Sequence, residues 1–223
     1  MRIIKTTQEL ETFTQELASS SFVAVDTEFM REKTFWPILC LIQAAAEGVE
    51  AIIDPLADGL DLTPFLELLA SKDIVKVFHA ARQDVEIFYK LMGTVPAPLF
   101  DSQIAAMACG FGDQIGYEPL MRTLVNAKID KASRFTDWSR RPLTDAQLTY
   151  AISDVTHLRE AYPILLDKLA SENRDHWVAE EMNDLLNPDL YYINPENAWQ
   201  RLRLKGEVKR SWPADETCGM ARE

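Results

Sequence analysis

Cysteine is scarce in this 223-residue chain, which has only Cys40, Cys109 and Cys218. Three scattered cysteines are too few for a disulfide framework or a zinc site. Long apolar runs are also missing, because no segment approaches the roughly 20 residues that span a bilayer, and the N-terminus has no apolar signal core. No internal repeat or low-complexity tract is present. These absences argue against a disulfide-rich or membrane-bound protein and predict a cytoplasmic location.

Basic residues are outnumbered, with 23 Lys and Arg against 35 Asp and Glu, so the formal net charge is -12. An acidic chain argues mildly against non-specific coating of nucleic acid. It does not exclude a nucleic-acid enzyme, because bound metal ions and local basic patches can dominate the field at a site. The hydrophobic share of 47% predicts one globular domain with a full core.

Hydrophobic periodicity predicts an α/β domain. Strands are expected at residues 2–5, 23–29, 38–45, 49–53, 74–78 and 99–100. Helices are expected at residues 7–18, 62–70, 81–92, 102–109, 117–125, 144–162, 172–186 and from 194 onward. Thr7 is the expected cap of the first helix, and Pro163 is expected to bend or end the sixth. Short links between three early strands predict an antiparallel meander, and the later alternation predicts a parallel portion.

The strand from Val23 to Phe29 carries two acids on one face, because Asp26 and Glu28 are two residues apart. Neighbouring carboxylates repel each other and lose hydration, a cost that a cation between them removes. Their oxygens are the hard ligands that Mg²⁺ and Mn²⁺ prefer. The alternative is a strand end that reaches solvent, where the same pair is harmless. The metal interpretation therefore requires further ligands elsewhere in the chain.

Two predicted helices supply further acids. Asp84 falls on the apolar face of its helix, where Arg82 is poorly placed to pair with it. Burial of an isolated carboxylate is prohibitive unless it is paired or bound to metal. Tyr150 and Asp154 are four residues apart on a later helix, so their side chains are neighbours. The alternative for them is an ordinary surface Tyr–Asp pair.

Together these residues resemble the motifs of the ribonuclease D-like 3'-5' exonucleases, in the DEDD superfamily. Three stretches match in order: Asp26-Thr27-Glu28, His79-Ala80-Ala81-Arg82-Gln83-Asp84 and Tyr150-Ala151-Ile152-Ser153-Asp154. A tyrosine four residues before the last aspartate marks the DEDDy branch, and residues 135–143 resemble ribonuclease D in particular. The resemblance covers about residues 2–204. It implies a ribonuclease-H-like mixed β-sheet with antiparallel and parallel strands, flanked by helices and followed by a helical C-terminal extension.

The resemblance implies a metal-dependent 3'-5' exoribonuclease. Such an enzyme removes 5'-mononucleotides from the single-stranded 3' end of RNA, such as a tRNA precursor or another structured RNA. Two divalent cations, Mg²⁺ or Mn²⁺, are expected among Asp26, Glu28, Asp84 and Asp154. Tyr150 is expected to orient the attacking water. The open alternatives are a DNA-directed exonuclease with the same chemistry, a non-catalytic nucleic-acid-binding relative, and a structural protein whose acids form buried ion pairs.

A second set of residues is expected to contact substrate, namely Thr27, Phe29, His79, Gln83, Arg134, Trp138 and Arg140. Phe29 has a core role as its alternative, and His79 a structural one. Basic residues cluster at 122–141 and again at 201–210, where they are expected to follow a phosphate backbone or to remain solvated.

The chain divides by composition and resemblance into three expected parts. Residues 1–170 are the expected exonuclease domain, 171–210 the helical extension, and 211–223 a flexible tail in place of a full HRDC domain. No obligate protein partner is inferred.

Overall fold

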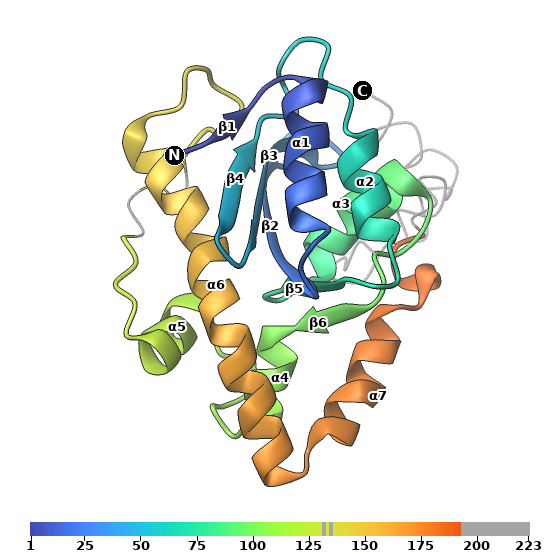
Figure 1. The fold of residues 1–223 in the computed structure, drawn as a ribbon, viewed down its shortest axis with the longest axis vertical. Helices are drawn as coiled ribbons and strands as arrows, with labels where there is room; N and C mark the ends of the chain where they lie inside the picture. Colours follow the sequence, from blue (N-terminus) through green and yellow to red (C-terminus); the bar gives the residue numbers. More distant parts are fainter. Residues whose placement is uncertain (131–132, 134–135, 193–223) are drawn as a thin grey trace, which may run out of the picture.

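A six-stranded mixed sheet forms the centre of the computed structural model, which describes residues 1–130, 133 and 136–192 (Figure 1). The strand order is β1-β4-β3-β2-β5-β6. The strands are β1 Ile3–Ile4, β2 Phe22–Met30, β3 Ile38–Ala46, β4 Val49–Ile53, β5 Val75–Phe78 and β6 Leu99–Asp101. Strands β2, β3 and β4 form the antiparallel part, while β1 joins β4, and β5 and β6 join β2, in parallel. The predicted meander with a parallel portion is thus confirmed.

Seven α-helices surround the sheet in the described part of the chain. They are α1 Thr7–Leu17, α2 Thr63–Ala70, α3 Arg82–Met92, α4 Ser102–Ala108, α5 Tyr117–Val125, α6 Asp145–Glu172 and α7 Asp175–Leu185. The N-cap of α1 is Thr6 rather than the predicted Thr7, because Thr6 forms a capping box with Glu9. The predicted helix from residue 194, the basic segment 201–210 and the tail 211–223 lie outside the described residues.

Helix α6 does not end at Pro163 but continues to Glu172. Proline removes one backbone hydrogen bond and crowds the preceding turn, at a cost of about 3 kcal/mol in a helix interior. The residues beyond it compensate by packing, since Leu165 and Leu169 are both buried. The long helix lies against β2, β3 and β4 and continues beyond the sheet to the bottom of the view in Figure 1.

The two faces of the sheet bury different sets of side chains. Ile42 and Ile53 belong to the apolar cluster that includes the buried face of α1. Their sequence neighbours Leu41 and Ile52 belong to a second cluster, together with Ala151 of α6. Because side chains alternate along a strand, the start of α6 and helix α1 cover opposite faces of the sheet.

Strand register places both acids of β2 on the α6 face. Glu28 lies opposite Leu41 of β3. Asp26 lies opposite Gln43, and Gln43 lies opposite Ile52 of β4. Directly opposed residues share a face of the sheet. The two acids therefore point toward the helix that carries the third motif.

No helix among the described residues combines the length and the apolar character needed to cross a membrane.

Candidate active site

Three carboxylates from two elements converge on the face of the sheet that the start of α6 covers. Asp26 and Glu28 come from β2, and Asp154 comes from α6, one turn after Tyr150. One ligand oxygen from each of these three acids lies within 4.8 Å of the others. The alternation of β2 and the packing of α6 on the same face of the sheet together produce this arrangement. Three converging carboxylates form a donor set suited to a hard divalent cation.

Asp84 joins the cluster from the first turn of α3, where its side chain is buried. The hydroxyl of Thr27, between the two acids of β2, donates a hydrogen bond of 2.5 Å to the Asp84 carboxylate. This bond joins the first and second sequence motifs directly. The Thr27 hydroxyl hydrogen is engaged in this bond. The Thr27 side chain, which was expected to contact substrate, therefore orients the Asp84 carboxylate.

The turn that leads into α3 is held by Asp101, which sequence reasoning did not single out. Its carboxylate accepts hydrogen bonds from the backbone N–H groups of Ala80 at 3.0 Å, Ala81 at 2.8 Å and Gln103 at 2.8 Å. Ala80 adopts a left-handed φ of 57°, an unfavourable conformation for a residue with a Cβ. The Asp101 bonds hold this turn and so fix the direction in which α3 presents Asp84.

The electrostatics of the cluster indicate that it is built to hold positive charge. Burial raises the pKa of Asp26 well above its ordinary value, and the charges of Asp84, Asp154 and Glu28 raise it further. Burial likewise raises the pKa of Asp84 to about 7, although the hydrogen bond from Thr27 opposes this shift. Buried acids whose pKa values are raised in this way are stabilised when cations neutralise them. The residues present therefore fit divalent metal ions.

The acids line an open cavity of about 530 Å³. The cavity wall also includes Tyr150 of α6 and Gln83 of α3. A volume of this size admits a terminal nucleotide rather than only a metal ion. The cavity thus combines carboxylates, a phenol and space for a substrate end.

Phe29 also lines this cavity, although strict alternation places it on the face opposite Glu28. The cause is a β-bulge. Glu28 lies opposite Leu41 but Phe29 lies opposite Leu39, so Cys40 is an extra residue on β3. A bulge twists its strand pair and redirects the side chains beside it. Phe29 therefore lies where a stacking role is available to it.

Comparison with known proteins places the chain in a family. The model of a family described as 3'-5' exonuclease matches residues 1–170. The chain belongs to the 3'-5' exonuclease family. It is 54% identical over 211 residues to Ribonuclease D from Jannaschia sp. (strain CCS1), and 50% identical over 208 residues to Ribonuclease D from Gluconacetobacter diazotrophicus. Each alignment covers 93% of this chain but only 55% and 53% of the relative, so the chain spans about half of their length.

A solved structure agrees with this assignment. The crystal structure of Escherichia coli RNase D superposes with a TM-score of 0.83 and 31% sequence identity, over 90% of this chain and 53% of that one. The resemblance to ribonuclease D and the mixed-sheet fold class that it implied are confirmed.

Trp138 does not line the cavity of this exonuclease-family chain, contrary to the contact with substrate expected from the sequence. Its side chain is only 2% exposed, in the cluster with Cys40, Leu41 and Ala151. Its ring lies 6.1 Å from the ring of Tyr150, at an interplanar angle of 30°. Trp138 therefore packs beside the Tyr150 ring and does not itself line the cavity. The aromatic residue was visible in the sequence, but its burial depends on packing against residues of β3 and α6 that are distant in the sequence.

His79 lines the cavity, but the surroundings of its ring favour the structural alternative. Its Nδ1 lies 2.9 Å from the hydroxyl of Ser102. Its Nε2 is buried and has no hydrogen-bond partner among the described residues. Burial lowers the pKa of His79, so the ring is neutral at pH 7. A neutral, enclosed imidazole is a poor ligand for phosphate.

Tyr117 is a cavity residue that sequence reasoning missed. Its hydroxyl donates to the backbone carbonyls of Ser153 and Asp154, at distances of 3.0 Å and 2.5 Å. This contact ties the N-terminal end of α5 to the turn of α6 that carries an acid. No sequence signal separates Tyr117 from other aromatic residues at helix starts.

Arg140, one of the two arginines expected at the substrate, does not line the cavity. Arg140 has a side chain that is 84% exposed and pairs with Asp137 at 3.2 Å. Arg134 lies outside the described residues. Gln83, by contrast, is exposed and lines the cavity wall.

The raised pKa of Asp84 predicts how stability depends on pH when metal is absent. A folded-state value of about 7 against 3.8 means that the folded protein binds the proton more tightly. The contribution of Asp84 to the free energy of unfolding is therefore full below pH 3.8 and is lost as the pH rises through 7, by up to roughly 4 kcal/mol. We expect the melting temperature in chelator to fall between pH 5 and pH 8, and Mg²⁺ to restore it more strongly at pH 8, where fewer protons compete.

Asp84→Asn is the matched control for this measurement, because it removes the titrating group but keeps an acceptor for Thr27. Its melting temperature in chelator should change less with pH than that of the wild type. Equal slopes for the two proteins would show that Asp84 does not titrate in this range.

Proposed function

We propose that this protein is a metal-dependent 3'-5' exoribonuclease that removes 5'-mononucleotides from single-stranded 3' ends. The observation that carries the proposal is the convergence of Asp26, Glu28 and Asp154, with oxygens within 4.8 Å of one another in an open cavity. Asp84 is a fourth acid of the same electrostatic cluster. These acids would hold two divalent cations, Mg²⁺ or Mn²⁺. Such cations supply charge neutralisation and water activation for phosphodiester hydrolysis.

The chain's own residues contribute position and hydrogen bonding. Tyr150 shares the cavity with the acids and would orient the attacking water through its phenol. Thr27 fixes the Asp84 carboxylate in one orientation. Water would add to the terminal phosphate, and the bond to the 3' oxygen of the preceding nucleotide would break. The products are a 5'-mononucleotide and an RNA shortened by one nucleotide.

A terminal nucleotide needs contacts besides the metal site. Phe29 lines the cavity near the acids and would stack on the last base. Gln83, which is exposed and also lines the cavity, would hydrogen-bond the sugar or phosphate. Both contacts are independent of base identity, which suits an enzyme that removes successive nucleotides.

RNA is the favoured substrate because of the relatives. The Escherichia coli structure, 31% identical to this chain, is described as an exoribonuclease involved in structured RNA processing. A tRNA precursor or another structured RNA with a free 3' end fits that description, and such a substrate is consistent with a cytoplasmic enzyme. The chain covers about half of these relatives, so the proposal concerns the activity of this chain itself.

The test is incubation of the full chain with a 5'-labelled RNA that has a single-stranded 3' extension. Reactions contain Mg²⁺, Mn²⁺ or EDTA, and a DNA of matched sequence runs beside each one. We expect a ladder of products shortened from the 3' end with either metal, none in EDTA, and slower shortening of the DNA. Preferential shortening of the DNA would favour the DNA-directed alternative. Binding of RNA without any shortening would favour the non-catalytic one.

A further inference from the structure

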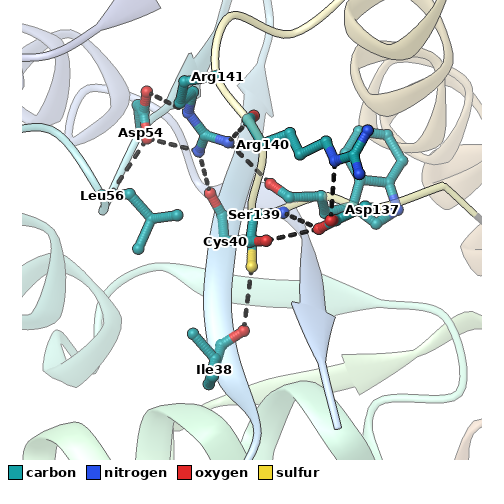
Figure 2. Close-up of polar contacts among 9 residues, drawn as sticks. Ile38, Cys40, Asp54, Leu56, Asp137, Ser139, Arg140 and Arg141 are labelled. Carbon is teal, nitrogen blue, oxygen red and sulfur yellow. Dashed lines mark hydrogen bonds and ion pairs between the residues drawn. The ribbon is translucent and has the colours of Figure 1, made fainter. Parts of the chain in front are cut away.

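The guanidinium of Arg141 uses all five of its N–H donors (Figure 2). Nε and Nη2 donate to the two carboxylate oxygens of Asp54, at 2.8 Å and 2.7 Å. Nη2 also donates to the carbonyl of Cys40 at 2.8 Å. Nη1 donates to the carbonyls of Trp138 at 2.7 Å and Arg140 at 2.8 Å. A side chain with every donor satisfied is held in one orientation.

The acceptors of Arg141 belong to three separate segments. Asp54 follows the end of β4, and its side chain is only 6% exposed. Cys40 is the extra residue of the β3 bulge, so its carbonyl lies outside the regular ladder and is open to another donor. Trp138 and Arg140 belong to the loop that leads into α6. One guanidinium therefore fastens this loop to the sheet at two points.

The fastened loop contacts both Tyr150 and the start of α6. The bonded carbonyl of Trp138 belongs to the residue whose buried ring faces the Tyr150 ring. Helix α6 begins four residues after Arg141 with a capping box between Thr144 and Gln147. The Gln147 amide also donates to the hydroxyl of Thr136 at 3.1 Å, which joins the loop to the helix start. The loop and the first turns of α6 form one hydrogen-bonded unit.

We infer that Arg141, through its pairing with Asp54, is a positioning residue for Tyr150, an inference that rests on the proposed function. Arg141 does not line the cavity. It holds the Trp138 ring behind Tyr150 and the start of α6 against the sheet. The phenol is thereby kept at a fixed place relative to Asp26 and Glu28 on β2. A displacement of about 1 Å at a reacting group can reduce turnover about 100-fold.

The test compares Arg141→Lys with Arg159→Lys in the full chain. Lysine keeps the charge beside Asp54 but cannot bond the Cys40, Trp138 and Arg140 carbonyls together. Arg159, on α6, is a matched control, because it also donates to a carboxylate and a carbonyl of the sheet region, Glu50 and Ala46, both at 3.0 Å. We expect Arg141→Lys to lower kcat about 10- to 100-fold with KM unchanged. Arg159→Lys should leave both unchanged.

A double-mutant cycle separates positioning from a general loss of structure. If Arg141 acts through Tyr150, Arg141→Lys should cost little further turnover in a Tyr150→Phe background. An equal loss of kcat in both backgrounds would overturn the inference, as would a loss confined to KM. If Arg141→Lys fails to fold, the neutral pair Arg141→Gln with Asp54→Asn replaces it in the same cycle, since removal of both charges leaves neither one unpaired.

Amide hydrogen exchange gives a readout that does not depend on activity. Arg141→Lys should speed exchange in peptides from residues 145–150 and leave α1 unchanged. Faster exchange together with no RNA shortening by the wild type would support the positioning role and refute the proposed function. Unchanged exchange at 145–150 would overturn the positioning role, whatever the wild-type activity.

Discussion

Asp84→Asn is expected to lower the rate of RNA shortening by about 1,000-fold or more, while the protein still folds. Loss of about 4 kcal/mol of transition-state stabilisation corresponds to this factor, and a cation held by carboxylates contributes several kcal/mol. The fold should survive, because the asparagine oxygen can still accept the hydrogen bond from Thr27. The substitution also removes the cost of burying the Asp84 carboxylate, whose pKa is raised to about 7. Single-turnover shortening and a thermal melt measure the two effects.

Glu86→Gln is the matched control, since Glu86 lies on the same helix two residues further on. It pairs with Arg31 at 2.8 Å and does not line the cavity. We expect this variant to shorten RNA at nearly the wild-type rate. Similar rates for Asp84→Asn and the wild type would remove Asp84 from the proposed metal site.

Tyr150→Phe is expected to lower kcat by about 100-fold and leave metal affinity unchanged. Hydrogen bonding and proton transfer by one positioned side chain typically contribute about 100- to 10,000-fold. The phenyl ring keeps its packing on Trp138, so the loss isolates the hydroxyl. Titration of Mn²⁺ by calorimetry checks metal affinity, and turnover at saturating RNA checks kcat.

The control for this substitution is Tyr162→Phe on the same helix. Tyr162 is nearly buried and packs on the rings of Phe22 and Phe100, away from the cavity. The turnover of Tyr162→Phe should match that of the wild type. Weaker Mn²⁺ binding by Tyr150→Phe would mean that the hydroxyl supports the metal site rather than the attacking water.

Local rules were sufficient for much of this fold. The period-two alternation of strand side chains placed Asp26 and Glu28 on one face, and the register of β2 and β3 agrees. Helical periodicity placed Asp84 on the buried face of its helix, where its side chain is only 7% exposed. Residue types at fixed spacing carry this information, because the covalent geometry of strands and helices sets which side chains share a face.

Tertiary effects explain the parts that were not predicted. Cys40 is the extra residue of a bulge, and its carbonyl accepts a hydrogen bond from Arg141, which is distant in the sequence. Pro163 remains inside a helix because the turns that follow are buried. Lys76 lies fully buried in a strand read as apolar, where its ammonium donates to the carbonyls of Ser71, Ile74 and Ala97. Each outcome depends on a partner that no local sequence pattern identifies.

The most direct measurement is anomalous diffraction from crystals of this protein soaked in Mn²⁺. We expect one peak between the carboxylates of Asp26, Glu28 and Asp154 and a second peak beside Asp84. Crystals of Asp84→Asn should lack the second peak. Carboxylates that remain together in the soaked crystal with no anomalous density among them would contradict the central claim that this cluster holds divalent cations.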